Sequence, residues 1–188
     1  MPKSMGGLNL VDPLTVNMTY GAKLWWRWIK EPNLPWARYW KEKYTPDCNN
    51  QDIVRLQEVP EGSPIWNLAC KNRSIVQENS FWEIHNGRFA LFWEDAWQQL
   101  PKLDTPELSS LKLLNQNEGR YRVHHYWNQS NRDPNWREWI SLNSGNNSDR
   151  NESTQQFNDI LQRRKIRKTE EEDKLRWGMR GSGNFSLK

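Results

Sequence analysis

Tryptophan is the residue type that most constrains how this chain can fold. The sequence holds 13 tryptophans among 188 residues, although its mean hydropathy is only −1.05. Disordered chains are usually poor in aromatic residues, and burial of a large apolar side chain contributes about 1.5–3 kcal/mol. The tryptophans therefore predict a packed core, which need not extend along the whole chain.

The first tryptophan cluster lies in residues 17–30, which have helical periodicity. The predicted apolar face holds Met18, Ala22, Trp25 and Ile29, widened by Leu24, Trp26 and Trp28. Lys23, Arg27 and Lys30 follow the spacing i, i+4, i+7 on the opposite side. Pro32 and Pro35 then interrupt the pattern. A second, shorter helix is predicted from the spacing of Trp36, Tyr39, Trp40 and Lys43.

A third helix is predicted after a loop at residues 45–62. Ser63 is a favourable N-cap and Pro64 suits the first helical position. The predicted apolar face of this helix holds Ile65, Leu68, Ala69 and Val76, and the helix should end near residues 77–80.

The stretch FWEIHNGRFALFWEDAW, residues 81–97, carries the strongest strand signal. Asn86-Gly87 is typical of a type I′ hairpin turn, in which both central residues need positive φ. The predicted hairpin pairs Ile84 with Phe89 and Trp82 with Leu91, which places these four side chains on one face.

The last third of the chain gives weaker signals. Prolines interrupt residues 101–150, and residues 143–151 resemble a polar linker. A helix is predicted within 154–168, and Leu175, Trp177, Phe185 and Leu187 suggest a final hairpin.

The predicted fold class is α+β. It has N-terminal Trp-rich helices, a central helix packed on a β-hairpin, and an irregular, partly disordered C-terminal third. We expect three regions: a helical segment at 1–44, a connector domain at 45–142, and a polar linker, basic helix and short hairpin at 143–188.

Charge and cysteine content narrow the class of protein. The net charge is +4, and basic ends flank an acidic middle, which suits a nucleic-acid partner but also an ordinary solvated surface. Cys48 and Cys70 lack the spacing of a zinc site or a disulfide framework. No signal peptide or membrane-length apolar run is visible, so we expect an intracellular chain that does not enter a membrane.

The familiar catalytic motifs are missing from the sequence. It has no phosphate-binding glycine loop, no GxSxG elbow and no Asp-Asp pair, so we expect no catalytic residue, no metal site and no cofactor. Asp95, which follows Glu94, is expected to cap a short helix or a turn. The adjacent His124 and His125 are expected to have diverging rings that do not share a metal ion.

Two basic stretches are the candidate nucleic-acid contacts. Lys23, Arg27 and Lys30 lie beside tryptophans, whose rings could stack on bases while the cations bind phosphates; a solvated helix face is the equal alternative. The second stretch holds Arg163, Arg164, Lys165, Arg167 and Lys168. Acidic residues 170–173 can pair with it, which weakens that hypothesis.

Several motifs in order resemble one family. They are Pro2-Lys3, Gly6-Gly7, Asp12, Asn17, Lys23, Trp26-Arg27, Lys43-Tyr44, Ser63-Pro64-Ile65-Trp66, the 84–97 block with Asn-Gly and Phe-Trp-x-Asp-x-Trp, Asp173-x-Leu175-x-Trp177 and Gly183-x-Phe185-Ser186. This order is similar to the region between the polymerase core and the C-terminal zinc-binding module of plant LINE-type (non-LTR) retrotransposon reverse transcriptases. His85 departs from the pattern, because the family usually has glycine there.

The resemblance implies an accessory fragment of an RNA-directed DNA polymerase that contacts RNA or DNA. The family's catalytic aspartates and zinc ligands have no matching positions here, and its polymerase and zinc-binding regions would be the missing partners. The implied location is the nucleus; a decayed copy encoded in an organelle genome is the open alternative. Helices separated from the polymerase are expected to expose several tryptophans. An aromatic-rich protein-interaction module and a decayed product without function are the alternatives.

Overall fold

The structure is a computed structural model that describes residues 12–100, 102–103, 121–126, 159–160, 163, 166 and 168–178. These residues form helices and a two-stranded antiparallel sheet, which confirms the α+β class. The chain divides into two compact units between Asn79 and Ser80. This division differs from the ranges 1–44 and 45–142 expected from the sequence, and the boundary expected at 142 lies outside the described residues.

The first unit begins with two helices that start at prolines. Helix α1 spans Pro13–Lys30, and the Asp12 carboxylate accepts the Thr15 N–H at 3.0 Å as its N-cap. It therefore starts four residues before the predicted start at residue 17. Helix α2 spans Pro35–Tyr44, so Pro35 opens a helix because its fixed φ suits the first turn.

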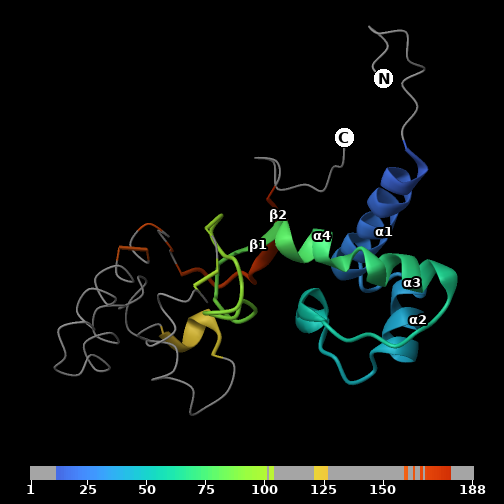
Figure 1. The fold of residues 1–188 in the computed structure, drawn as a ribbon. Helices are drawn as coiled ribbons and strands as arrows, with labels where there is room; N and C mark the ends of the chain where they lie inside the picture. The colour runs from blue at the N-terminus through green and yellow to red at the C-terminus, as the bar shows by residue number, and fades with distance from the viewer. Residues whose placement is uncertain are drawn as a thin grey trace, which may run out of the picture. The chain divides into compact units, whose positions relative to one another are not determined.

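Three further helices follow among the described residues of this unit. The 3-10 helix η2 spans Asn50–Arg55, inside the predicted loop 45–62, and α3 spans Pro64–Lys71. The predicted cap is confirmed, since the Ser63 hydroxyl accepts the Trp66 N–H at 3.3 Å. A break at Asn72 separates α3 from α4, which spans Arg73–Glu78. Figure 1 shows these helices together.

Trp66 is the centre of the aromatic core of the first unit. Its side chain is fully buried, and its ring stacks on Tyr44 with 4.2 Å between centroids. The rings of Trp28 and Trp40 meet it edge to face, at 5.2 and 5.1 Å between centroids. The helices therefore bury these tryptophans, and the expectation that several would be exposed was wrong.

Two apolar positions were assigned to the wrong side of their helices. Ile65 and Met18 were predicted to face the core, yet both are exposed. In α3 the buried position belongs to the neighbouring Trp66, because the large ring fills the space between the helices. Around Met18, the N-terminal half of α1 leaves its apolar side chains exposed.

The second unit contains the sheet. Strand β1 spans Ser80–Glu83 and strand β2 spans Lys174–Trp177, in an antiparallel pair that sets Trp82 opposite Leu175. Ser80, Trp82, Leu175 and Trp177 are buried, so one face of the pair belongs to the core. Figure 1 shows the two paired strands next to each other.

The predicted Asn86-Gly87 hairpin was wrong, because β1 pairs with a strand about ninety residues later. A type I′ turn requires positive φ at both central residues. Gly87 has a φ of 70°, but Asn86 does not have a positive φ. The central helix α3 packs against α1 and not on a hairpin. Leu175 and Trp177 belong to β2, while Phe185 and Leu187 lie outside the described residues.

Hydrogen bonds to backbone carbonyls connect the loops of the second unit. Trp97 is fully buried and donates its indole N–H to the Phe92 carbonyl at 3.0 Å. The 3-10 helix η5, Val123–Tyr126, is joined to the loop by the Val123 N–H, which donates to the Ala90 carbonyl at 3.0 Å. Among the described helices, none has the length and apolar character that a bilayer-spanning segment needs.

Candidate nucleic-acid interface

The predicted basic stripe lies on the exposed side of α1. Lys23, Arg27 and Lys30 are all exposed, and their spacing places them within one narrow sector of the helix. Arg27 forms an ion pair with Glu31 at 2.9 Å, and the Lys30 ammonium lies 5.8 Å from the centroid of the Trp26 ring. The α1 helix itself contains no acidic residue, so the stripe has an excess of positive charge.

The tryptophans beside the stripe are not available for stacking. Trp25, Trp26 and Trp28 are buried, and the Trp28 indole donates to the Ala37 carbonyl at 3.1 Å. The expectation that these rings could stack on bases was therefore wrong, because their side of α1 packs into the aromatic core.

Tyr20 supplies an exposed ring instead. Its side chain is 53% exposed. It precedes Lys23 by three residues and Arg27 by seven, so all three lie on one face. Val16, also exposed, extends the same face by one further turn. Sequence reasoning missed Tyr20, although the i, i+3, i+7 spacing with the two cations could have indicated it.

The second basic stretch is only partly described. Arg163 is exposed and Lys168 is half-buried, whereas Arg164, Lys165 and Arg167 lie outside the described residues. Its proposed pairing with residues 170–173 does not hold for Asp173, whose carboxylate binds backbone amides of another loop. Glu171 forms an ion pair with Lys174.

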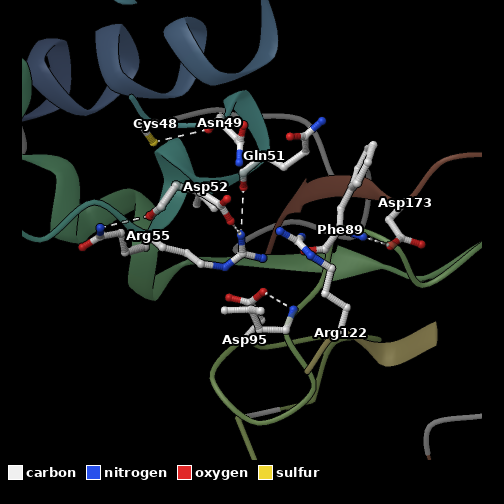
Figure 2. Close-up of polar contacts among 12 residues, drawn as sticks. Cys48, Asn49, Gln51, Asp52, Arg55, Phe89, Asp95, Arg122 and Asp173 are labelled. Carbon is white, nitrogen blue, oxygen red and sulfur yellow. Dashed lines mark hydrogen bonds and ion pairs between the residues drawn. The ribbon is translucent and has the colours of Figure 1, made fainter. Parts of the chain in front are cut away.

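Asp173 of the second unit accepts three backbone hydrogen bonds. It is buried, and it accepts the backbone N–H groups of His85, Gly87 and Phe89, each at 2.8 Å. Figure 2 shows the bond to Phe89, beside which the Arg122 guanidinium donates to the Phe89 carbonyl at 2.7 Å. This carboxylate shapes the 85–89 loop.

Asp95 has a similar structural role. Its carboxylate accepts the Leu91 N–H at 2.7 Å, and its own N–H returns to the Leu91 carbonyl at 3.3 Å. This confirms the predicted turn cap (Figure 2). No group of three or more His, Cys, Asp or Glu able to hold a metal ion occurs in the part of the chain that the structure describes.

The histidines differ from expectation. The His124 and His125 rings lie 3.9 Å apart between centroids and do not diverge. Each ring is held by a neighbouring backbone group: His124 Nδ1 lies 3.2 Å from the Gly87 carbonyl, and His125 Nδ1 accepts the Arg122 N–H at 2.9 Å. The pKa of His124 is lowered, mainly by burial and to a lesser extent by the neighbouring His125.

A polar cluster of His85, Glu83, Thr169 and Arg176 links β1 and the residue just after it to β2 and the segment before it. His85 Nδ1 lies 3.2 Å from the Thr169 hydroxyl, and His85 Nε2 lies 3.8 Å from the Glu83 carboxylate. Glu83 is bonded more closely to Arg176, at 2.7 Å, which lowers the pKa of the Glu83 carboxyl. Because Arg176 neutralises this carboxylate, the group is a structural link between the two strands.

The free thiols are not activated. Cys70 is buried, and burial raises the pKa of its thiol to about 11, so at neutral pH it is protonated and a poor nucleophile. Cys48 is half-buried, and burial likewise raises its pKa.

Comparison with known proteins gives no relative for this chain: no family model, curated protein or solved structure matches it.

Proposed function

We propose that this chain is a non-catalytic accessory region of a LINE-type reverse transcriptase and that it contacts RNA or DNA through α1. The observation that carries the contact is the exposed stripe of Lys23, Arg27 and Lys30 on a helix without acidic residues. The ordered motifs from residue 2 to residue 186 support the family assignment.

The packing behind the stripe supports a binding role. Trp25 and Trp28 are buried on the other side of α1, so the packing of these two rings holds the helix in place. Positioned Lys and Arg side chains attract phosphates with little ordering cost, and each phosphate contact releases counterions. This makes α1 a rigid support for a cationic surface.

Two described carboxylates of the second unit have structural partners, which supports the proposal that the chain is not catalytic. Asp95 and Asp173 are both buried and both bind backbone amides. Two-metal nucleotidyl transfer needs carboxylates that converge on a pair of cations. Purified chain should therefore incorporate no nucleotides on a primed template, and template-dependent incorporation would refute this part of the proposal.

Charge removal on α1 tests the binding. The triple variant Lys23→Gln, Arg27→Gln, Lys30→Gln should weaken RNA binding about tenfold or more at low salt. Log affinity of the natural chain should fall with log salt concentration with a slope of about −2 for three phosphates on a single strand, and the variant should lose most of this slope. Fluorescence anisotropy with labelled RNA measures both.

The matched control removes the same charge elsewhere. Lys71, Arg88 and Lys102 are exposed and lie outside α1; their simultaneous replacement by Gln should change the affinity much less. Equal losses in the two triple variants would show that net charge alone, and no particular surface, drives the binding, and would contradict the proposal.

A protein-interaction module is the second candidate, favoured by the exposed Leu14, Val16 and Met18 near the start of α1. Apolar side chains gathered on one exposed segment are typical of protein interfaces. Binding of a protein partner that ignores salt, together with no affinity for RNA or DNA, would favour this candidate. A chain without helical circular dichroism would favour the decayed product.

A further inference from the structure

The α1 stripe combines an aromatic ring with cations in one line. Val16, Tyr20, Lys23, Arg27 and Lys30 are separated by four, three, four and three residues, the spacing that keeps side chains on one helix face. At 1.5 Å per residue, Tyr20 lies about 5 Å along the axis from Lys23 and about 15 Å from Lys30. The ring therefore stands at one end of the row of cations.

Tyr20 differs from the other aromatic residues of α1. Its side chain is 53% exposed, whereas Trp25, Trp26 and Trp28 are buried. The exposed ring is thus not needed for the core around Trp66. An exposed aromatic ring next to cations can stack on a planar group of a ligand while the cations bind negative charges of the same ligand.

A nucleobase has this chemistry only when it is unstacked. In a duplex both faces of each base are covered by its neighbours, so an exposed tyrosine gains little from a base pair. In a single strand the base faces are free, and stacking on aromatic side chains combined with a cationic groove is the usual mode of binding. The cations alone would hold either form, since both present phosphates.

We infer that α1 binds single-stranded nucleic acid, with a base stacked on Tyr20 and the phosphates on its 3′ or 5′ side held by Lys23, Arg27 and Lys30. This rests on the proposed nucleic-acid contact and deepens it by naming the form of the ligand and the residue that selects it. Charge complementarity favours this ligand over an apolar protein segment, because the larger part of the stripe is basic.

The experiment compares two probes on the full chain. One is a fluorescein-labelled oligouridylate of about 12 nucleotides, within the range of about 4–16 nucleotides that single-strand binding modules cover; the other is an RNA duplex of the same length. Tyr20→Ala should weaken oligouridylate binding about 5- to 100-fold, the range found when a stacking aromatic is removed. Duplex binding should stay within about twofold, because phosphate contacts alone support it.

Two further variants serve as controls. Tyr20→Phe keeps the ring and should bind oligouridylate within about twofold of the natural chain. Tyr39 is as exposed, at 54%, but it lies on α2, outside the row of residues on α1. Tyr39→Ala should therefore leave the affinity nearly unchanged. Circular dichroism should show equal helix content in all of these variants.

The outcomes separate this inference from the proposed function. If Tyr20→Ala has no effect while the Lys23, Arg27, Lys30 triple variant loses binding, the stacking role is overturned and the nucleic-acid contact stands. Equal losses on the single strand and the duplex would overturn the preference for single strands. If the natural chain binds neither probe, the proposed function itself fails.

Discussion

At the scale of single residues, Asp173 explains the course of the 85–89 loop in the second unit. One carboxylate accepts three backbone N–H groups spaced two residues apart, at 85, 87 and 89. These amides could otherwise form part of a hairpin ladder. Hydrogen bonds to a charged acceptor are about twice as strong as neutral ones, so the loop wraps around the carboxylate in preference to folding on itself.

The first prediction concerns this carboxylate. Asp173→Ala should lower the free energy of unfolding of the second unit by about 3 kcal/mol, because buried N–H donors lose their acceptor. Hydrogen exchange should show loss of protection at the amides of His85, Gly87 and Phe89. Glu172→Ala, a change at the exposed neighbour, should leave the three amides protected; equal loss in both variants would contradict the assignment.

At the scale of elements, α1 and α3 approach each other closely at Gly21. A Cβ built there would lie 2.6 Å from the Leu68 carbonyl oxygen and 2.5 Å from the Asn72 side-chain nitrogen. A backbone atom of α3 cannot swing aside as a side chain can. The glycine therefore sets the distance between the two helices, and with it the position of the aromatic side of α1.

The second prediction follows from this contact. Gly21→Ala would ordinarily stabilise a helix by about 1 kcal/mol, but here overpacking against α3 should reverse the sign, with a net loss of about 1–2 kcal/mol. Thermal unfolding followed by circular dichroism measures the difference. Asn17→Ala, on an exposed position of α1, is the control and should be neutral or slightly stabilising. A more stable Gly21→Ala chain would show that the helices can separate without cost.

The elements also show which parts of the fold the sequence could reveal. The start of α3 was predictable, because Ser63 and Pro64 act on their own helix within a few residues. The partner of β1 was not, because the competing signals are remote: Asn86-Gly87 is a local turn pattern, whereas Asp173 and β2 lie some ninety residues away. A local pattern cannot report that a distant carboxylate offers the same amides stronger bonds.

The candidate interface also has one part that was predictable from the sequence and one part that was not. The cations on α1 were predictable from helical spacing alone, since charged side chains at i, i+4 and i+7 share a face. Whether Trp26 or Tyr20 would supply the exposed ring depended on how α1 packs against α3. That packing is fixed by contacts between separate helices, such as Gly21 with Leu68, which no single segment of sequence displays.

At the scale of the whole molecule, the described tryptophans contribute to the core of each of the two units. In the first unit the rings gather around Trp66, and in the second unit Trp82, Trp97 and Trp177 are buried. This distribution accounts for a tryptophan-rich chain with low mean hydropathy, because a few large rings fill each small core. Each unit therefore has its own source of stability.

The last prediction tests that separation. Trp66→Ala removes a fully buried side chain whose ring contacts Trp28, Trp40 and Tyr44, and should destabilise the first unit by about 3–5 kcal/mol. Trp36→Ala, at the half-buried edge of the same cluster, should cost less. Hydrogen exchange of the amides that Asp173 binds should stay slow in both variants, since local stability follows the local core. Loss of protection there in Trp66→Ala would mean that the two cores unfold as one, and the tryptophans would then act as a single cooperative network.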